Sequence, residues 1–226
     1  MLYSTEQLVM VAVTVVLVMG SAIVHEVAHG LAALALGDPT AKEAGRLTLD
    51  PRAHVDGFGS ILLPLVMALV GGPVFAFARP VPYNPRRLRH PRRDELLVAL
   101  AGPLSNLLQA VLGTLLLKLA WEAALARVLG VDAALWAVQI LATYVYVNLV
   151  LCFFNLIPLP PLDGSKVILF FLSGRARREF YRLEQYAMPI LIILLYVVPS
   201  LLRVDPVGTY LELTAGSIYD LLMAGV

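Results

Sequence analysis

The chain has 226 residues, of which 59% are hydrophobic and 15% are Asp, Glu, Lys or Arg, and its mean hydropathy is +0.81. This composition excludes an ordinary soluble domain and indicates an integral membrane protein. The formal net charge is only +1, and most arginines gather in two stretches. Membrane topology and anionic lipid headgroups explain such stretches, so we expect no nucleic-acid partner.

The first predicted element is a transmembrane helix over Leu8 to Leu36. No Lys or Arg precedes Lys42, and the apolar run far exceeds the roughly 7 to 15 residues of a signal-peptide core. We therefore expect a retained span, with about 20 residues needed to cross the hydrocarbon.

This span contains the sequence His25-Glu26-Val27-Ala28-His29, an H-E-x-x-H pattern. On a helix, imidazoles at i and i+4 share a face and can bind one zinc ion, which leaves Glu26 beside the open coordination position as a general base. The alternative is a histidine pair hydrogen-bonded to neighbouring helices. Ionisable groups at membrane depth are expensive, which favours the metal site.

The polar loop after this span contains "GRLTLD", Gly45 to Asp50, which alternates like a short β-strand. An exposed strand edge could bind an extended substrate backbone. His54 follows, with three possible roles: an additional metal ligand, a gate over the metal, or a loop histidine hydrogen-bonded to Asp50 or Asp56.

Residues 57–78 form a second uncharged run, interrupted by Pro64 and by Gly71-Gly72-Pro73. The interruptions favour a re-entrant segment over a full crossing. Re-entry would place the loop before it on the cytoplasmic side and the N-terminus outside, whereas a full crossing would reverse both.

Arginine-rich stretches follow at residues 79–93, with six arginines, and at residues 175–182, with four. The positive-inside rule predicts that both face the cytoplasm. Further spans are expected over Leu96 to Leu117, Ala133 to Ile157 and Ala187 to Leu202. The predicted fold is thus one all-α polytopic membrane domain, residues 1–226, with four to five transmembrane helices, a re-entrant segment and a short β-like loop.

A catalytic zinc usually takes three protein ligands, and Asp163 is the best candidate for the third. It lies in "NLIPLPPLDGSK", where prolines stop the preceding helix. Non-helical backbone at membrane depth is tolerated only when it is buried or lines a wet cavity. The alternative is a surface turn in which Asp163-Gly164 caps the next helix.

Three patterns in order, H-E-x-x-H, "AGPLSN" (residues 101–106) and "NLIPLPPLDG" (residues 155–164), resemble the site-2 protease family of intramembrane zinc metalloproteases. The resemblance implies that His25, His29 and Asp163 bind Zn²⁺ and that Glu26 is the catalytic base. It also implies that five further residues shape the substrate cleft: Gly102, Pro103, Asn106, Asn155 and Pro158.

Physical reasoning leaves alternatives for these cleft residues. Asn106 and Asn155 can satisfy the peptide groups of an unwound substrate, or they can form interhelical hydrogen bonds that hold the bundle together. Gly102 can equally serve close helix approach.

The loop at residues 40–59 and the connector "ARPVPYNPRR" (residues 78–87) resemble a compact bacterial and archaeal branch of the family without a PDZ domain. This resemblance implies a multi-pass protein of a prokaryotic plasma membrane that cleaves transmembrane or membrane-adjacent segments of protein substrates. The alternative is a zinc-binding scaffold or transporter-like protein without proteolytic activity. Glu26 argues against it, because a storage or transport site needs no base.

Overall fold

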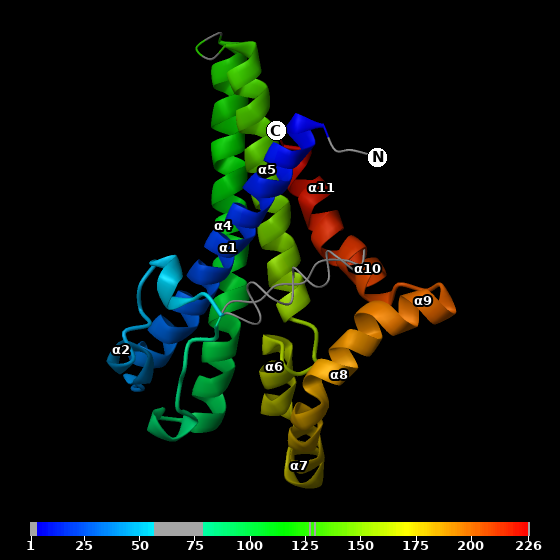
Figure 1. The fold of residues 1–226 in the computed structure, drawn as a ribbon. Coiled ribbons are helices and arrows are strands. Elements are labelled where there is room, and N and C mark those ends of the chain that lie inside the picture. The colour runs from blue at the N-terminus through cyan, green and yellow to red at the C-terminus, as the bar shows by residue number, and fades with distance from the viewer. Residues whose placement is uncertain (1–3, 57–78, 127, 129, 226) are drawn as a thin grey trace.

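The computed structural model describes residues 4–56, 79–126, 128 and 130–225. Within these ranges the chain is helical, and no strand occurs. Four helices are long and apolar enough to cross a membrane: Thr5–Ala35, Pro91–Leu125, Val131–Asn155 and Gly174–Leu202. The all-α polytopic fold is confirmed (Figure 1).

Helix α1 (Thr5–Ala35) has both ends fixed by local hydrogen bonds. At its start, Ser4 and Gln7 form a capping box, in which each side chain accepts from the other residue's backbone N–H. At its end, Gly37 adopts φ +108°, and the N–H groups of Gly37 and Asp38 donate to Leu34 O and Ala33 O at 3.1 and 2.9 Å. This Schellman motif turns the chain sharply out of the helix.

Helices α4 (Pro91–Leu125) and α5 (Val131–Asn155) form the long antiparallel pair of the bundle (Figure 1). Helix α4 begins five residues before the predicted span, because Pro91 at its first turn needs no hydrogen-bond acceptor for a backbone N–H. Ala110 of α4 and Val145 and Leu149 of α5 are fully buried and form one core cluster.

The rest of the chain is a series of shorter helical segments. They are α6 (Asp163–Phe171), α7 (Gly174–Leu183), η4 (Glu184–Tyr186), α8 (Ala187–Ile192), η5 (Ile193–Val197), α9 (Val198–Leu202), α10 (Pro206–Leu211), η6 (Glu212–Gly216) and α11 (Ser217–Met223). Sequence analysis gave no element after Leu202. The structure adds the consecutive segments α10, η6 and α11 there, and Ala215 of η6 is fully buried against the core of α4 and α5.

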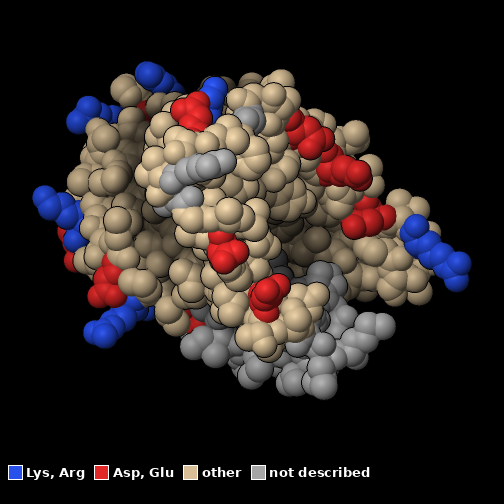
Figure 2. All heavy atoms as spheres, turned by 90° about the horizontal axis from the view of Figure 1, so that it is seen from above, with Lys and Arg blue, Asp and Glu red and all other residues tan. Residues whose placement is uncertain are grey.

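The loop after α1, the connector before α4 and helices α6 and α7 all lie at one end of the molecule (Figure 1). We call it the arginine-rich end, since it contains residues 79–93 and 175–182. Hydrogen bonds join its parts: the N–H of Arg89 donates to Leu36 O at 3.2 Å, and the Arg92 guanidinium donates to Phe170 O and Leu172 O. Seen from the opposite end, Asp and Glu side chains are scattered over the surface, and Lys and Arg side chains lie at the edges of the view (Figure 2).

The loop after α1 contains helix α2 (Thr40–Glu43) and the 3₁₀ turn η1 (Pro51–Ala53). The predicted strand at residues 45–50 is wrong, because side chains rather than a neighbouring strand bind the nearby backbone. His54 Nε2 lies 2.8 Å from Thr48 O, and Arg46 donates to Arg79 O at 2.6 Å. The predicted re-entrant segment, residues 57–78, lies outside the described residues.

Candidate metal centre

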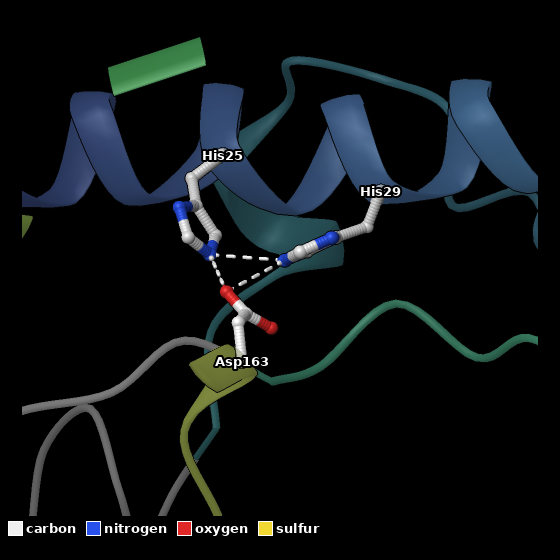
Figure 3. A group of neighbouring side chains, drawn as sticks. All are labelled: His25, His29 and Asp163. Atoms are coloured by element: carbon white, nitrogen blue, oxygen red, sulfur yellow. Dashed lines mark hydrogen bonds and ion pairs between the residues drawn. The ribbon is translucent and has the colours of Figure 1, made fainter. Parts of the chain in front are cut away.

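His25, His29 and Asp163 meet at one point between α1 and the start of α6 (Figure 3). Their nearest atoms form a triangle. His25 Nε2 and His29 Nε2 are 3.0 Å apart, and Asp163 Oδ2 lies 3.1 Å from the first and 3.2 Å from the second. The structure therefore brings the predicted i, i+4 histidine pair together with an aspartate more than 130 residues later in the chain.

The other nitrogen of each imidazole has a partner of its own. His29 Nδ1 lies 2.7 Å from the backbone carbonyl of Val98, and His25 Nδ1 lies 2.6 Å from Asn106 Oδ1. Both partners are acceptors, so each Nδ1 carries the proton and each Nε2 directs a lone pair toward Asp163. Such partners are characteristic of metal-binding histidines, whose orientation and tautomer they set.

This donor set fits zinc. Two imidazole lone pairs and a carboxylate oxygen that face one another repel unless a cation lies between them, and Asp163 Oδ2 is buried with no conventional hydrogen-bond donor. Tetrahedral zinc with bonds near 2.0 to 2.2 Å separates its ligand atoms by about 3.3 Å. The three sides of 3.0 to 3.2 Å come close to that spacing.

Asp163 is the first residue of α6, directly after the proline-rich turn that follows α5. Gly164 lets the two helices approach. A Cβ at Gly164 would overlap the backbone carbonyls of Leu156 and Ile157 at the end of α5. The absent side chain therefore places the Asp163 carboxylate at the depth of the histidines.

Gly102 of α4 packs directly against the imidazole pair. A Cβ there would lie 2.5 Å from His25 Nε2 and would also overlap His29 Nε2. The neighbouring Pro103 is buried inside the same helix. Glycine at this position thus leaves the room that the two Nε2 atoms occupy.

Glu26 points to the connector rather than to the triangle itself. Its Oε2 accepts a hydrogen bond of 2.7 Å from the backbone N–H of Val81. Sequence analysis could not anticipate this contact or that of Val98, because a backbone group has no residue-type signal.

The connector is fixed beside α1 by close packing and hydrogen bonds. Gly30, one turn after Glu26, has no room for a Cβ, which would approach Leu47 and Val81 at 2.5 and 2.9 Å. Asp38 is fully buried and accepts from the backbone of Asn84 in the connector and from both N–H and hydroxyl of Thr40. Burial acts to raise the pKa of Asp38, but these hydrogen bonds outweigh it and hold the pKa below its usual value.

Three predicted residues lie apart from the triangle. His54 is buried, but its Nε2 lies against Thr48 O rather than against Asp50 or Asp56, and it is outside the group of three possible ligands found among the described residues. Asn155 donates to Leu151 O within its own helix at 2.9 Å. Pro158 is exposed in the turn after α5.

A pocket opens at the arginine-rich end. Its walls come from the connector, α4, α6 and α7, with Tyr83, Glu95, Lys166 and Arg177 among the lining residues. Burial, followed by the charge of Glu95, raises the pKa of Tyr83, and the charge of Asp163 adds to this effect. The pocket and the triangle are therefore within electrostatic reach of each other.

Comparisons with known proteins identify the family of the chain. Residues 122–198 match the model of peptidase family M50. The chain is 40% identical over 190 residues to YwhC of Bacillus subtilis, covering 82% of this chain and 77% of the relative, which is named as a zinc metalloprotease. It is 33% identical over 178 residues to Rip2 of Mycobacterium tuberculosis, also named as a zinc metalloprotease, covering 78% of this chain and 63% of the relative. No solved structure matches.

Proposed function

Because the chain belongs to peptidase family M50, the site-2 proteases, and is a membrane zinc metalloprotease, we propose that it is an endopeptidase that cleaves transmembrane or membrane-adjacent segments of protein substrates. The observation that carries the proposal is the convergence of His25 Nε2, His29 Nε2 and Asp163 Oδ2 with Glu26 one residue from the first ligand. A site that only stores or transports zinc has no use for that carboxylate.

These three residues are the zinc ligands in the proposal. When bound, zinc supplies a Lewis acid that polarises the scissile carbonyl and makes water a stronger acid. The imidazoles bind through Nε2, while Val98 and Asn106 hold their Nδ1–H groups and prevent rotation of the rings. Gly102 keeps α4 clear of the ligand nitrogens.

Glu26 is the general base. The Val81 N–H holds Oε2, which orients the carboxylate and leaves Oε1 to accept a proton from the attacking water. The water oxygen bonds to the scissile carbonyl carbon, the C–N bond breaks, and Glu26 passes the proton to the departing amine nitrogen. The connector thus positions the base through its backbone.

The proposed active site lies inside the bilayer but near one face. Helix α1 continues for six residues after His29, about 9 Å at 1.5 Å per residue. The nearer face is the arginine-rich end, which the positive-inside rule assigns to the cytoplasm. Hydrogen bonds join the loop after α1 to the connector, which supports placing both on the cytoplasmic side. Helix α1 then starts outside, with the N-terminus.

The test uses purified protein in detergent or liposomes with a model transmembrane peptide. Glu26→Gln removes the base but none of the ligands, so we expect cleavage to fall by about 100- to 10,000-fold at unchanged zinc content. Mass spectrometry of the products locates the cleaved bond.

Equal cleavage by wild type and Glu26→Gln would contradict the proposed mechanism. Cleavage only outside the apolar segment of the peptide would limit the activity to membrane-adjacent sites. A protein that binds zinc but cleaves no peptide would favour the scaffold alternative.

A further inference from the structure

Asn148, in the middle of α5, is connected to the proposed zinc ligand His25 through one other side chain. Asn106 Nδ2 donates to Asn148 Oδ1 at 2.9 Å, and Asn106 Oδ1 accepts from His25. Asn148 Nδ2 in turn donates to Ser21 Oγ and to the backbone carbonyl of Tyr144, each at 3.0 Å. Ser21, Asn106 and Asn148 are at most 1% exposed, so water does not compete for these bonds.

The backbone carbonyl of Tyr144 fixes the direction of every bond in this chain. A carbonyl only accepts, so Asn148 must turn its NH₂ group toward Tyr144 and its oxygen toward Asn106. Asn106 must then present NH₂ to Asn148 and oxygen to His25. Reversing either amide would bring two acceptors or two donors together in a buried place, where no water can satisfy them.

The consequence for His25 is a single tautomer. An amide oxygen at 2.6 Å requires a proton on Nδ1, which leaves Nε2 without one and able to bind metal. The tautomer of His29 needs no such network. Its Nδ1 faces the backbone carbonyl of Val98, which can only accept a hydrogen bond. Only the His25 tautomer depends on the orientation of side-chain amides.

We propose that Asn148 is a positioning residue of the metal centre, which holds the Asn106 amide in the orientation that keeps His25 Nε2 open to zinc. Without Asn148, Asn106 can rotate by half a turn and present its NH₂ group to His25. That orientation stabilises the imidazole tautomer with a proton on Nε2, which leaves no lone pair on Nε2 for zinc. This inference rests on the proposed zinc site and adds a residue of α5 to it.

The test measures the zinc affinity of purified protein by competition with a chromophoric chelator. Asn148→Leu is expected to weaken zinc binding by roughly 10- to 100-fold, the range for lost outer-shell partners. Adding Asn106→Asp to this variant is expected to restore the affinity, because a carboxylate has no donor to present to His25 in either orientation. Loss of packing alone would not be rescued in this way.

Gln109→Leu is the matched control. Gln109 is also buried in α4 and accepts a hydrogen bond of 3.0 Å from the Tyr144 hydroxyl of α5. It shares the partner Tyr144 with Asn148, but its own side chain is not bonded to Asn106 or Asn148 among the described residues. Its replacement removes an α4–α5 hydrogen bond of the same kind and is expected to leave zinc affinity unchanged.

Unchanged zinc affinity in Asn148→Leu, or a folded double variant that binds as weakly as the single one, would overturn the inference. His29→Ala separates it from the proposed function: if that variant keeps zinc, the zinc site itself is wrong. If Asn148→Leu does not fold, ¹⁵N spectra of the histidine side chains in zinc-loaded wild type decide. The chain has only four histidines, and a His25 Nδ1 without a proton would contradict the inference.

Discussion

His25 and His29 reach the metal centre from one regular helix, whereas Asp163 reaches it from the first residue of a nine-residue helix that follows a proline-rich turn. The spacing of the histidines is set locally by the helical repeat. The place of Asp163 depends on how closely α6 approaches the end of α5. The comparison teaches that one half of the site is fixed by α1 itself and the other half by packing between elements.

The largest effect is expected from removing a ligand in either half. His29→Ala and Asp163→Ala each leave two protein ligands, and we expect zinc affinity to fall by more than the roughly 100-fold seen for outer-shell partners. Chelator competition measures it, with the exposed His90→Ala as control. Tight, stoichiometric zinc in Asp163→Ala would show that the third ligand is another residue.

Gly102→Ala tests the half built on α1. The added methyl group would overlap the two ligand nitrogens, so we expect zinc affinity to fall by roughly 10- to 100-fold. Gly113→Ala in the same helix is the control, because its methyl group would approach Tyr144 and Val145 at 2.9 and 3.0 Å but neither ligand. It should cost about 1 to 3 kcal/mol of stability without weakening zinc binding, and equal zinc loss in both variants would contradict a specific role for Gly102.

Gly164→Ala tests the half built on α6. The clash with the carbonyls of Leu156 and Ile157 pushes α6 away and withdraws Asp163, while the histidines stay in place. We expect about a tenfold loss of zinc affinity, the lower end of the outer-shell range. X-ray absorption of the residual bound zinc should then show two histidine nitrogens and fewer protein oxygens, and an unchanged ligand set would refute this dependence.

The smallest effect is expected from Asp38→Asn, which leaves both halves of the site intact. Loss of the charged acceptor weakens the attachment of the connector by about 1 to 3 kcal/mol, and we expect a lower thermal midpoint with unchanged zinc affinity. The folded-state pKa of Asp38 is depressed. The contribution of Asp38 to the free energy of unfolding is therefore fully present above the unfolded-state pKa near 3.9. It is lost as the pH falls through the folded-state pKa.

Thermal unfolding in detergent as a function of pH measures this contribution. Wild type should lose stability below about pH 4, and the difference from Asp38→Asn should shrink over the same interval. If the stability difference between wild type and Asp38→Asn grew on acidification, the pKa of Asp38 would not be lowered in the folded state.

The predictable parts of the fold and site are those with a residue-type pattern over short distances. The spans follow from apolar runs, and the histidine pair follows from its spacing in α1. Asp163 was identified from a proline-broken helix end and a family resemblance, but nothing in the spacing determined the 3.1 Å approach to His25. The polar residue Asn148 within an apolar span was a signal that sequence analysis left unused.

Other features had no signal or a misleading one. The alternation in residues 45–50 predicts a strand, but His54 binds the backbone carbonyl of Thr48 there, and the Arg46 side chain reaches the carbonyl of Arg79 in the connector. For Asn106 the residue type left a cleft role and an interhelical hydrogen bond open, and the structure places its amide against His25 of α1. Both outcomes depend on which elements pack together, and a single segment carries no information about that.

The amino-acid sequence alone shows that this protein lies in the membrane, that α1 carries two imidazoles on one face, and that a carboxylate follows the first of them. Hydropathy and the helical repeat are local properties, which makes these conclusions independent of the rest of the chain. Only the tertiary structure shows where Asp163 lies, which backbone N–H holds Glu26, and which side chain faces His25 Nδ1. Those depend on contacts of about 3 Å between residues 55 to more than 130 positions apart, and only packing of the whole bundle sets such distances.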